Sequence, residues 1–160
     1  MDRADHLGQP VITVAPATRA DADVWLELRL ALWPGEDRRN EFIGEISQML
    51  ADAGDTVTFI AWDDRAGAVG FVEAGLRHDF VNGCETSPVA FLEGVYVSPA
   101  YRRRGVAGLL VDTVADWGRQ RGCAEFASDA LLDNTQSHAM HHALGFQETQ
   151  RVVYFRKVLG

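Results

Sequence analysis

Hydrophobic side chains recur with two different periods on either side of a short basic segment in the second half of the chain. Residues 91–97 are rich in aromatic and β-branched types, which favours a buried or half-buried strand. Pro99 then ends the strand, because proline donates no backbone N–H. Beyond Pro99 the apolar positions fall on one face of a predicted helix. These positions are Val106, Leu109, Leu110, Thr113, Val114 and Trp117. The pattern predicts a strand, a loop and a helix between residues 91 and 122.

The rest of the chain divides into further strand and helix patterns. Thr18 and Asp21 form a signature similar to a capping box, which predicts the start of a helix. In chain order, the other predicted elements are a strand at 11–15, helices at 21–33 and 39–51, a hairpin of strands at 56–62 and 68–76, a polar loop at 78–88, a strand at 124–128, a helix at 134–144 and one or two strands within 148–158. The segment 1–10 is polar, so we expect it to be a flexible N-terminus. The length of the chain predicts a single domain over residues 1–160.

Composition narrows the class of protein. Hydrophobic residues make up 47% and charged residues 24% of the 160 residues, as in an ordinary globular domain. No apolar run approaches the length that crosses a bilayer, so we expect no membrane partner. The two cysteines, Cys84 and Cys123, lack CxxC spacing, and free thiols in a reducing cytosol are the simplest interpretation. We therefore expect a cytoplasmic protein.

The net charge of −8 argues against nucleic acid as a partner, because polyanions need a basic face. An acidic surface instead attracts cationic substrates. The basic exception is a local run, Arg102-Arg103-Arg104-Gly105, directly before the predicted helix at 106.

This basic run predicts an anion site. A helix N-terminus already carries partial positive charge and unpaired N–H groups, so three arginines there are unfavourable unless an anion joins them. Gly105 and Gly108 would let a ligand approach the backbone closely. The alternative is a solvated basic turn, but the strand before and the amphipathic helix after favour a phosphate cradle. The lysine of a Walker loop is missing.

Residues 102–107 resemble the Q/R-x-x-G-x-G/A pyrophosphate loop of the GNAT acetyltransferase superfamily. In that family the loop holds the diphosphate of acetyl-coenzyme A. The resemblance implies acetyl-CoA as co-substrate and assigns its binding to Arg102, Arg103, Arg104, Gly105, Val106 and Ala107. The element order is also that of the GNAT fold, which is an α/β fold with a mixed, splayed, mostly antiparallel sheet flanked by helices.

The resemblance extends to the pantetheine arm of the cofactor. Asn134, followed by a helix that ends at Gly145-Phe146, is similar to the family signature in which an asparagine contacts this arm. In the family the arm also pairs with the central strand, which implicates the backbone of Val95 and Val97. A main-chain N–H there would polarise the thioester carbonyl, and we expect a bulge or splay that exposes it.

Two carboxylates stand out by position. Glu93 interrupts an apolar run, which is unfavourable unless the carboxylate is paired or open to a ligand. Asp129 lies where its strand should end, at the edge where open α/β sheets bind ligands. Glu93 could equally lie on a solvated face or pair with an arginine, and Asp129 could cap a turn or helix. From position alone, these readings remain open.

A narrower resemblance bears on both carboxylates. Segments 32–35, 77–84, 87–94 and 127–129 look like those of aminoglycoside 6'-N-acetyltransferases. The segments that line the drug pocket in that family match Trp33, Asp79, Phe80, Glu93 and Asp129. The resemblance implies that Glu93 and Asp129 hold the amino sugar and that one of them takes the amine proton, directly or through water.

His141 takes the place of a tyrosine that in many GNAT enzymes protonates the departing thiolate. A histidine can donate that proton, although Tyr96 or Tyr154 could reach instead. His138, His141 and His142 have helical spacing that could bind a metal. No carboxylate or cysteine partner has the usual spacing, so we expect a polar helix face and no metal.

The leading hypothesis is acetyl transfer from acetyl-CoA to the 6'-amine of aminoglycoside antibiotics, by direct attack in a ternary complex, which would confer resistance. The first alternative keeps the chemistry but takes a polyamine or cationic peptide as acceptor. The second is a non-catalytic sensor that binds acetyl-CoA and docks a partner. Family members often dimerise through their C-terminal strands, so a homodimer is expected.

Overall fold

A computed structural model describes residues 11–160 and contains one five-stranded sheet in the order β1-β2-β3-β4-β5. The first four strands are antiparallel neighbours, and β5 runs parallel to β4. The strands are β1 (Ile12–Pro16), β2 (Thr56–Asp63), β3 (Gly67–Arg77), β4 (Val89–Val97) and β5 (Phe126–Ser128). The predicted mixed, mostly antiparallel sheet is confirmed. The predicted flexible segment 1–10 lies outside the described residues.

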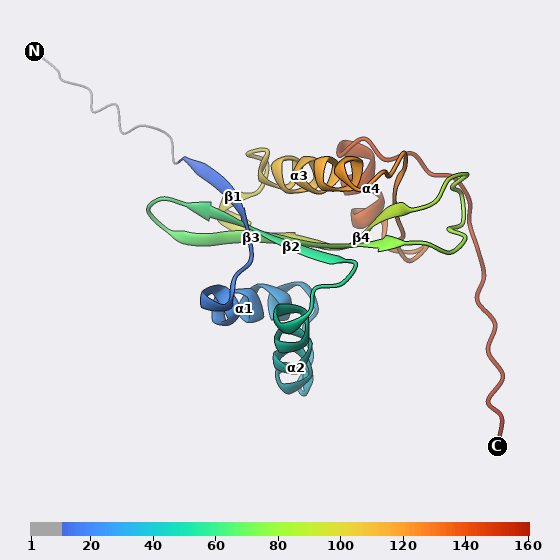
Figure 1. The fold of residues 1–160 in the computed structure, drawn as a ribbon, viewed down its shortest axis with the longest axis horizontal. Coiled ribbons are helices and arrows are strands. Elements are labelled where there is room, and N and C mark those ends of the chain that lie inside the picture. Colours follow the sequence, from blue (N-terminus) through green and yellow to red (C-terminus); the bar gives the residue numbers. More distant parts are fainter. Residues whose placement is uncertain (1–10) are drawn as a thin grey trace, which may run out of the picture.

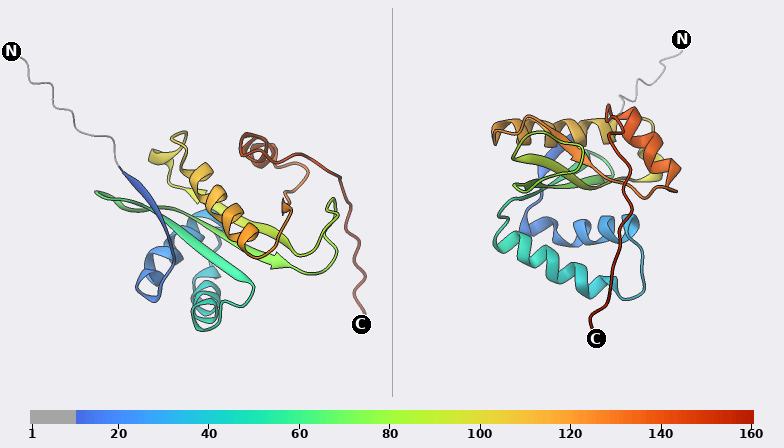
Figure 2. Two further views of the ribbon diagram at one scale, coloured as in Figure 1. Left: turned by 45° about the horizontal axis from the view of Figure 1, so that its top comes forward. Right: turned by 90° about the vertical axis from the view of Figure 1, so that its right-hand side faces the viewer.

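Helices cover both faces of the sheet (Figure 1). On one face lie α1 (Ala22–Leu32) and α2 (Arg38–Ala51), and on the other lie α3 (Val106–Gln120) and α4 (Thr135–Ala143). Two short 3-10 turns, η1 (Arg19–Asp21) and η2 (Pro99–Tyr101), precede α1 and the basic loop. Figure 2 shows the same three layers from two further directions. No helix within residues 11–160 is long and apolar enough to cross a membrane.

The alternation of side chains along the strands gives the sheet two apolar faces and hence two cores. Leu110 and Val114 of α3 are fully buried against one face, where Val72 lies. Phe71, the next residue along β3, points to the opposite face and packs with Trp25 of α1. The sheet is therefore packed between two layers of helices.

A β-bulge at Glu93 changes which edge of β4 each residue faces. Glu73 pairs with Gly94 while Ala74 pairs with Leu92, so Glu93 is an extra residue in β4. Before the bulge, the Ala90 N–H donates to the carbonyl oxygen of Glu125, the residue before β5, at 3.1 Å. Beyond the bulge, the inserted residue reverses which residues direct their backbone N–H and C=O groups toward β3 and which toward the β5 side. The bulge expected near 95–97 thus lies two residues earlier.

The sheet opens beyond the bulge because β5 is short. Only residues 126–128 pair with β4, opposite residues 90–92. Within the described part of the chain, β4 continues to Val97 without a strand on that side. β4 and β5 therefore form a wedge that is closed at Ser128 and open toward the basic loop. This is the splay that the sequence predicted.

The predicted strands within 148–158 are wrong for the single chain. Residues 146–160 contain no strand or helix, and all side chains from 147 onward are exposed. A strand requires a neighbour to accept and donate its backbone hydrogen bonds, and the tail runs away from the body of the molecule (Figures 1 and 2). The apolar alternation is present, but one chain alone provides no partner for it.

Candidate functional site

The basic loop adopts a backbone shape that gathers N–H groups. Arg103 and Gly105 both have left-handed conformations, with φ of 63° and 80°. Alternation of left- and right-handed residues makes a concave nest of N–H groups that binds anions. Gly105 is also the N-cap residue of α3, and the first turn of that helix holds no acidic side chain. The helix end is therefore free of any internal anion.

The three arginines of the loop are exposed, and none forms an ion pair with any residue in the range 11–160. Arg102 donates from Nε to the Val97 carbonyl oxygen at 3.0 Å, with its guanidinium 5.6 Å from the Tyr96 ring centre. Arg104 lies 5.4 Å from the Tyr101 ring centre. These contacts orient the charges without neutralising them. The loop therefore offers positive charge to an anion, and binding of the CoA diphosphate by these residues stays a prediction.

Tyr101 ties this loop to the sheet. Its hydroxyl donates to Asp63, the last residue of β2. This hydrogen bond is the main cause that lowers the pKa of Asp63, with a second contribution from the N–H of Arg65. The same bond raises the pKa of Tyr101. The carboxylate is therefore held ionised, and it fixes the position of η2 just before the arginines.

The open edge of β4 carries the backbone groups of Val95 and Val97. The Ser98 N–H donates to the Val69 carbonyl of β3 at 2.8 Å, so alternation turns Val97 and Val95 toward the opposite edge. The contact of Arg102 with the Val97 carbonyl lies on that edge. An extended pantetheine arm can pair there as an additional strand. That Val95 and Val97 bind the arm stays a prediction.

Glu93 forms an ion pair at the bulge. Its Oε1 lies 2.8 Å from Arg77 Nη2, and both side chains are nearly half exposed. Arg77 also lies 4.0 Å from the ring centre of Phe91. The sequence left open whether Glu93 faces solvent, pairs with an arginine or contacts a ligand, and in the structure it pairs with Arg77. The carboxylate remains accessible to solvent, so a substrate ammonium can compete with Arg77 for it.

Asp129 follows β5 directly and is exposed. No hydrogen bond or ion pair to its carboxylate is present within residues 11–160, so it does not act as a cap there. The carboxylate keeps its full capacity to accept hydrogen bonds from a cationic ligand. Its position immediately beyond Ser128 places it near the closed end of the wedge.

Trp33 lies directly after α1 and packs over the bulge. A Cβ atom on Gly94 would overlap the Trp33 ring, so the glycine makes room for it. The ring is edge-on to Phe42 and Phe71, with centre distances of 6.2 and 6.1 Å. A shallow pocket beside it is lined by Arg29, Trp33, Arg38, Phe42 and Glu45. Trp33 and Glu93 are thus brought together at one point of the sheet.

Asp79 and Phe80 lie on the loop between β3 and β4. Both are exposed, Phe80 at 81% of its surface. Within the described residues neither takes part in a hydrogen bond, ion pair or aromatic pair. Their assignment to the substrate wall rests on the family resemblance and stays a prediction.

Asn134 and His141 both take part in the local structure of α4. The Asn134 side-chain oxygen accepts from the Ser137 N–H at 3.1 Å and so caps the helix, while its amide NH₂ remains available to the cofactor arm. His141 lies between the Ser128 hydroxyl and the Ser137 carbonyl, 2.7 Å from each. His138 contacts the Leu131 carbonyl at 2.9 Å. Within residues 11–160, no three metal-binding side chains converge.

Sequence reasoning missed a buried polar network beneath the bulge. Trp25 Nε1 donates to Glu73 Oε1 at 2.7 Å, and Arg29 Nε lies 2.8 Å from the same oxygen. Burial raises the pKa of Glu73, while the Arg29 charge opposes that shift. Because Glu73 pairs with Gly94 across the bulge, the network supports the backbone under Trp33 and Glu93. A glutamate within the apolar run of β3 was the available signal.

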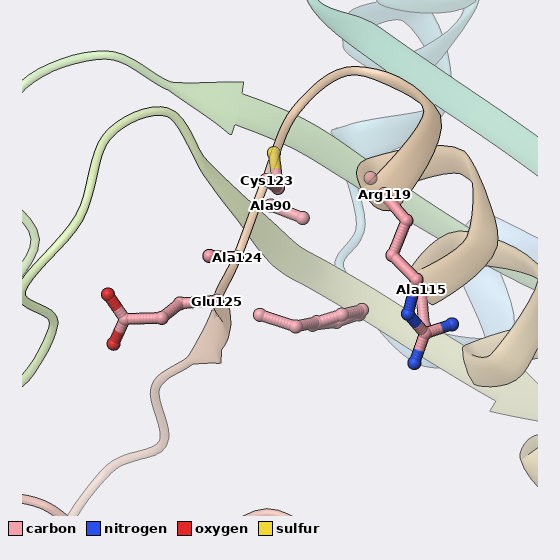
Figure 3. A pocket seen from close by; sticks show the side chains of 8 residues that line it. Ala90, Ala115, Arg119, Cys123, Ala124 and Glu125 are labelled. Carbon is pink, nitrogen blue, oxygen red and sulfur yellow. The ribbon is translucent and has the colours of Figure 1, made fainter.

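A separate hollow lies between the end of α3 and β5 (Figure 3). Its volume is about 80 Å³, and small side chains such as Ala90 and Ala115 line it. The Glu125 carboxylate points away from Arg119 on the far side, as Figure 3 shows. Glu125 instead accepts from the N–H groups of Glu85 and Thr86 at 2.8 and 2.7 Å. The hollow is a packing gap and does not belong to the wedge.

Together, the fold and the wedge define an acyl-CoA-dependent acyltransferase site, with an anion-binding loop, an open strand edge and nearby carboxylates. The profile described as "Acetyltransferase (GNAT) family" matches residues 22–146. The chain belongs to the GNAT acetyltransferase family.

Relatives and solved structures agree with this assignment. The chain is 47% identical over 149 residues to "Aminoglycoside N(6')-acetyltransferase type 1" of Acinetobacter baumannii, covering 93% of this chain and 100% of that protein. It is 50% identical over 147 residues to the protein of the same name from Stenotrophomonas maltophilia, covering 92% and 94%.

Two solved structures are similar over nearly their whole length. Aminoglycoside antibiotic 6'-N-acetyltransferase AAC(6')-Ih from Acinetobacter baumannii has a TM-score of 0.88 at 46% identity, covering 94% of this chain and 100% of that one. AAC(6')-Iy in complex with the bisubstrate analogue CoA-S-monomethyl-acetylneamine has a TM-score of 0.85 at 42% identity, covering 93% and 99%.

Proposed function

We propose that the protein transfers acetyl from acetyl-CoA to the 6'-amine of aminoglycoside antibiotics, in a ternary complex, and so confers resistance to them. The proposal is carried by the wedge between β4 and β5, which unites an anion loop with exposed carboxylates. It is supported by relatives that are 47 to 50% identical over almost their full length and are named aminoglycoside N(6')-acetyltransferases. A CoA–neamine bisubstrate analogue bound to a similar structure supports both substrate classes.

Each part of the wedge has a separate task in this reaction. The thioester of acetyl-CoA supplies an acyl carbon that an amine can attack. The N–H nest and the arginines at 102–104 hold the diphosphate, and the open edges of Val95 and Val97 align the arm. A backbone N–H on that edge donates to the thioester oxygen, which gains negative charge during attack. Asn134 offers its free amide to the same arm.

The carboxylates of Glu93 and Asp129 bind the acceptor amine and remove its proton. An alkyl ammonium with a pKa near 10 is deprotonated in only about one molecule in a thousand at pH 7, so the site must remove a proton. Glu93 and Asp129 attract the polycationic sugar, and one of them accepts that proton directly or through water. Trp33, Asp79 and Phe80 complete the substrate wall, because aromatic faces and carboxylates bind ammonium groups.

The activity is tested by incubating purified protein with acetyl-CoA and kanamycin or tobramycin and measuring free thiol. We expect thiol release that depends on both substrates, together with a mass increase of one acetyl group on the drug. Nuclear magnetic resonance of the product then shows whether the acetyl group is on the 6'-nitrogen. Thiol release no faster than in protein-free controls would contradict the proposal.

The two alternatives predict different results in the same assay. A polyamine or cationic-peptide acetyltransferase would have a higher kcat/KM for those amines than for the drugs. A non-catalytic sensor would not need carboxylates, so Glu93→Gln and Asp129→Asn would leave its function unchanged. We expect both variants to lose turnover while calorimetry shows unchanged CoA binding. The acidic wedge favours the enzymatic reading.

We further propose a homodimer in which the C-terminal tail of each copy packs on the other. The tail keeps strand-like alternation, yet Val153, Tyr154 and Phe155 are 77, 82 and 92% exposed. A contiguous exposed apolar segment of this kind is typical of a surface that another protein covers. The free edge of β5 is short and unpaired within residues 11–160, which makes it a natural acceptor.

The dimer is tested by light scattering during size-exclusion chromatography. We expect the full chain to elute with about twice its 17.6 kDa mass. The double variant Tyr154→Asp, Phe155→Asp should shift it toward monomer, while Arg156→Asp serves as a charge-matched control in the same segment. A monomeric full chain would contradict this part of the proposal.

We also propose a cytoplasmic location without a nucleic-acid or membrane partner and without a metal. Support comes from the free thiols of Cys84 and Cys123 and from the net charge of −8, which opposes polyanion binding. Activity that survives a metal chelator would support the metal-free mechanism, and loss of activity restored by added zinc would contradict it.

A further inference from the structure

We infer that Ser128 relays the amine proton to the departing sulfur, with His141 holding that proton between the two transfers. The inference rests on the proposed acetyl transfer, because it names the groups that move a proton in that reaction. It replaces the simpler expectation that His141 donates directly to the thiolate. The observations that carry it are the hydrogen bonds around the His141 ring and the position of Ser128 at the closed end of the wedge.

The hydrogen bonds of His141 determine its tautomer. Nδ1 lies 2.7 Å from the carbonyl oxygen of Ser137, and a carbonyl oxygen can only accept, so Nδ1 carries the proton. Ser137 Oγ, at 3.3 Å from Nδ1, is a weaker second contact. In the neutral ring Nε2 is then an acceptor. The Ser128 hydroxyl, 2.7 Å from Nε2, is the group that donates to it.

The Ser128 proton has no better acceptor nearby. The Leu92 carbonyl oxygen is 3.5 Å from Ser128 Oγ, well beyond the usual O–H···O distance. The ring of His141 is held in place by the edge of Phe146, with centres 5.5 Å apart. His141 Nε2 can therefore accept the hydroxyl proton of Ser128. As that proton leaves, Ser128 Oγ becomes able to accept a proton from another group.

Ser128 is also in the right place. It is the last residue of β5 to pair with β4, opposite Leu92 and beside the bulge at Glu93. Beyond it, the open edge of β4 carries the backbone groups of Val95 and Val97. Ser128 therefore lies where the wedge closes, directly before Asp129 and opposite the residue that precedes Glu93. His141 Nε2 contacts Ser128 Oγ directly, at 2.7 Å.

A carboxylate takes the first proton of the ammonium before attack, as proposed above. Starting from the neutral amine, the proton balance closes with Ser128 and His141. As the nitrogen–carbon bond forms, the amine nitrogen becomes positively charged and gives a proton to Ser128 Oγ, while the Ser128 proton passes to His141 Nε2. The carbon–sulfur bond then breaks and its electron pair stays on sulfur. Ser128 gives its proton to that sulfur and recovers the one held on Nε2. The net change moves one proton from nitrogen to sulfur, and both residues return to their starting states.

The competing explanation is that the Ser128–His141 bond only joins α4 to β5. Single-turnover rates of acetyl transfer separate the two roles, because they report the chemical steps and not product release. We expect Ser128→Ala to slow this rate by about 100-fold, the lower end of general acid–base effects, with CoA affinity unchanged by calorimetry. Ser128→Thr keeps the hydroxyl and should recover most of the rate. His141→Gln should resemble Ser128→Ala.

Solvent deuterium gives a second measure of the relay. Two protons move together in the proposed step, so the single-turnover rate of the unaltered protein should fall nonlinearly as the deuterium fraction rises. In Ser128→Ala the dependence should become linear. A structural role predicts the same dependence in both proteins, after folding of each has been checked by its melting temperature.

A readout without substrate tests the geometry itself. Nitrogen resonances of the imidazole in the unliganded protein should show His141 protonated on Nδ1, both in the unaltered protein and in Ser128→Ala. A proton on Nε2 of the neutral ring would overturn the inference, as would an unchanged single-turnover rate in Ser128→Ala. If the unaltered protein transfers no acetyl group at all, the proposed function fails instead, and the two failures are therefore distinguishable.

Discussion

Gly94 and Trp33 occupy adjoining space so tightly that any Cβ atom on Gly94 would overlap the Trp33 ring. The two residues are 61 positions apart in the sequence, 94 minus 33, and meet because α1 packs beneath the bulged part of β4. The ring in turn contacts Phe42 and Phe71. The absence of a side chain at position 94 therefore sets the position of an aromatic wall beside Glu93.

Gly94→Ala should displace Trp33 and weaken binding of the acceptor. We expect the KM for tobramycin to rise about tenfold, equivalent to about 1.4 kcal/mol, while the KM for acetyl-CoA stays within about twofold. Gly44→Ala is the matched control, because a Cβ there has open space within α2 and should be neutral or slightly stabilising. Equal increases in both KM values would indicate general distortion and contradict the assigned role of Trp33.

The basic loop should govern CoA affinity. Arg102→Ala removes a guanidinium held near the strand edge, and Gly105→Asp adds both a carboxylate and backbone strain at a φ of 80°. Each should weaken CoA binding by about 10- to 100-fold, the range of about 1.5–3 kcal/mol for charge-assisted hydrogen bonds. Calorimetry with CoA and, separately, with the drug measures this. Arg119→Ala, at the far end of α3, is the control, and equal loss of both ligands would make the loop merely structural.

The buried network beneath the bulge should contribute strongly to stability. Glu73→Ala removes the buried acceptor shared by Trp25 and Arg29, while Arg29, only 7% exposed, keeps its second ion pair, with Glu45 at 2.6 Å. We expect the free energy of unfolding to fall by about 1–3 kcal/mol, because buried donors of Trp25 and Arg29 lose their acceptor. Glu73→Gln should reduce it less, because the amide oxygen still accepts from Trp25. Denaturant titration measures both, and a loss below about 1 kcal/mol for Glu73→Ala would contradict the importance of the pair.

The Tyr101–Asp63 hydrogen bond should make stability depend on pH. Because the bond lowers the pKa of Asp63 in the folded state, its contribution is present above the unfolded carboxyl pKa and is lost as pH falls through the lowered folded value. Tyr101→Phe should therefore lower the melting temperature at neutral pH, and the difference from the unaltered protein should shrink in acid. Ser47→Ala removes a hydroxyl from an exposed position of α2 and should give a difference that does not change with pH. A difference that is constant with pH would contradict the bond.

Much of the fold could be predicted from local patterns. The period change between 91–97 and the helix from Val106, and the hairpin tip at 63–67, depend on neighbours in the chain, and both elements were confirmed. Register depends on contacts between distant segments. The bulge at Glu93 could be expected near this part of β4, but its residue is determined by how β3 pairs with β4.

The candidate site divides in the same way. The arginines at 102–104 and the glycine after them are a contiguous motif, and their chemistry is readable because a helix end follows directly. The partner of Glu93 could not be chosen from the sequence, which left solvent, an arginine and a ligand open. The structure contains Arg77, 16 residues away on the neighbouring strand.

By itself the sequence determined the order of elements, the anion loop and the acidic residues that suit a cationic acceptor, because these depend on side-chain types at fixed spacing along one chain. Only the tertiary structure decided that Gly94 makes room for Trp33, that Ser137 fixes the His141 tautomer toward Ser128, and that the tail at 148–158 forms no strand within one chain. The first two features depend on contacts between residues that are far apart in the sequence. The third depends on whether a neighbouring strand is present for the tail. Alternation predicts a strand, but a strand forms only where an edge is available to pair with it.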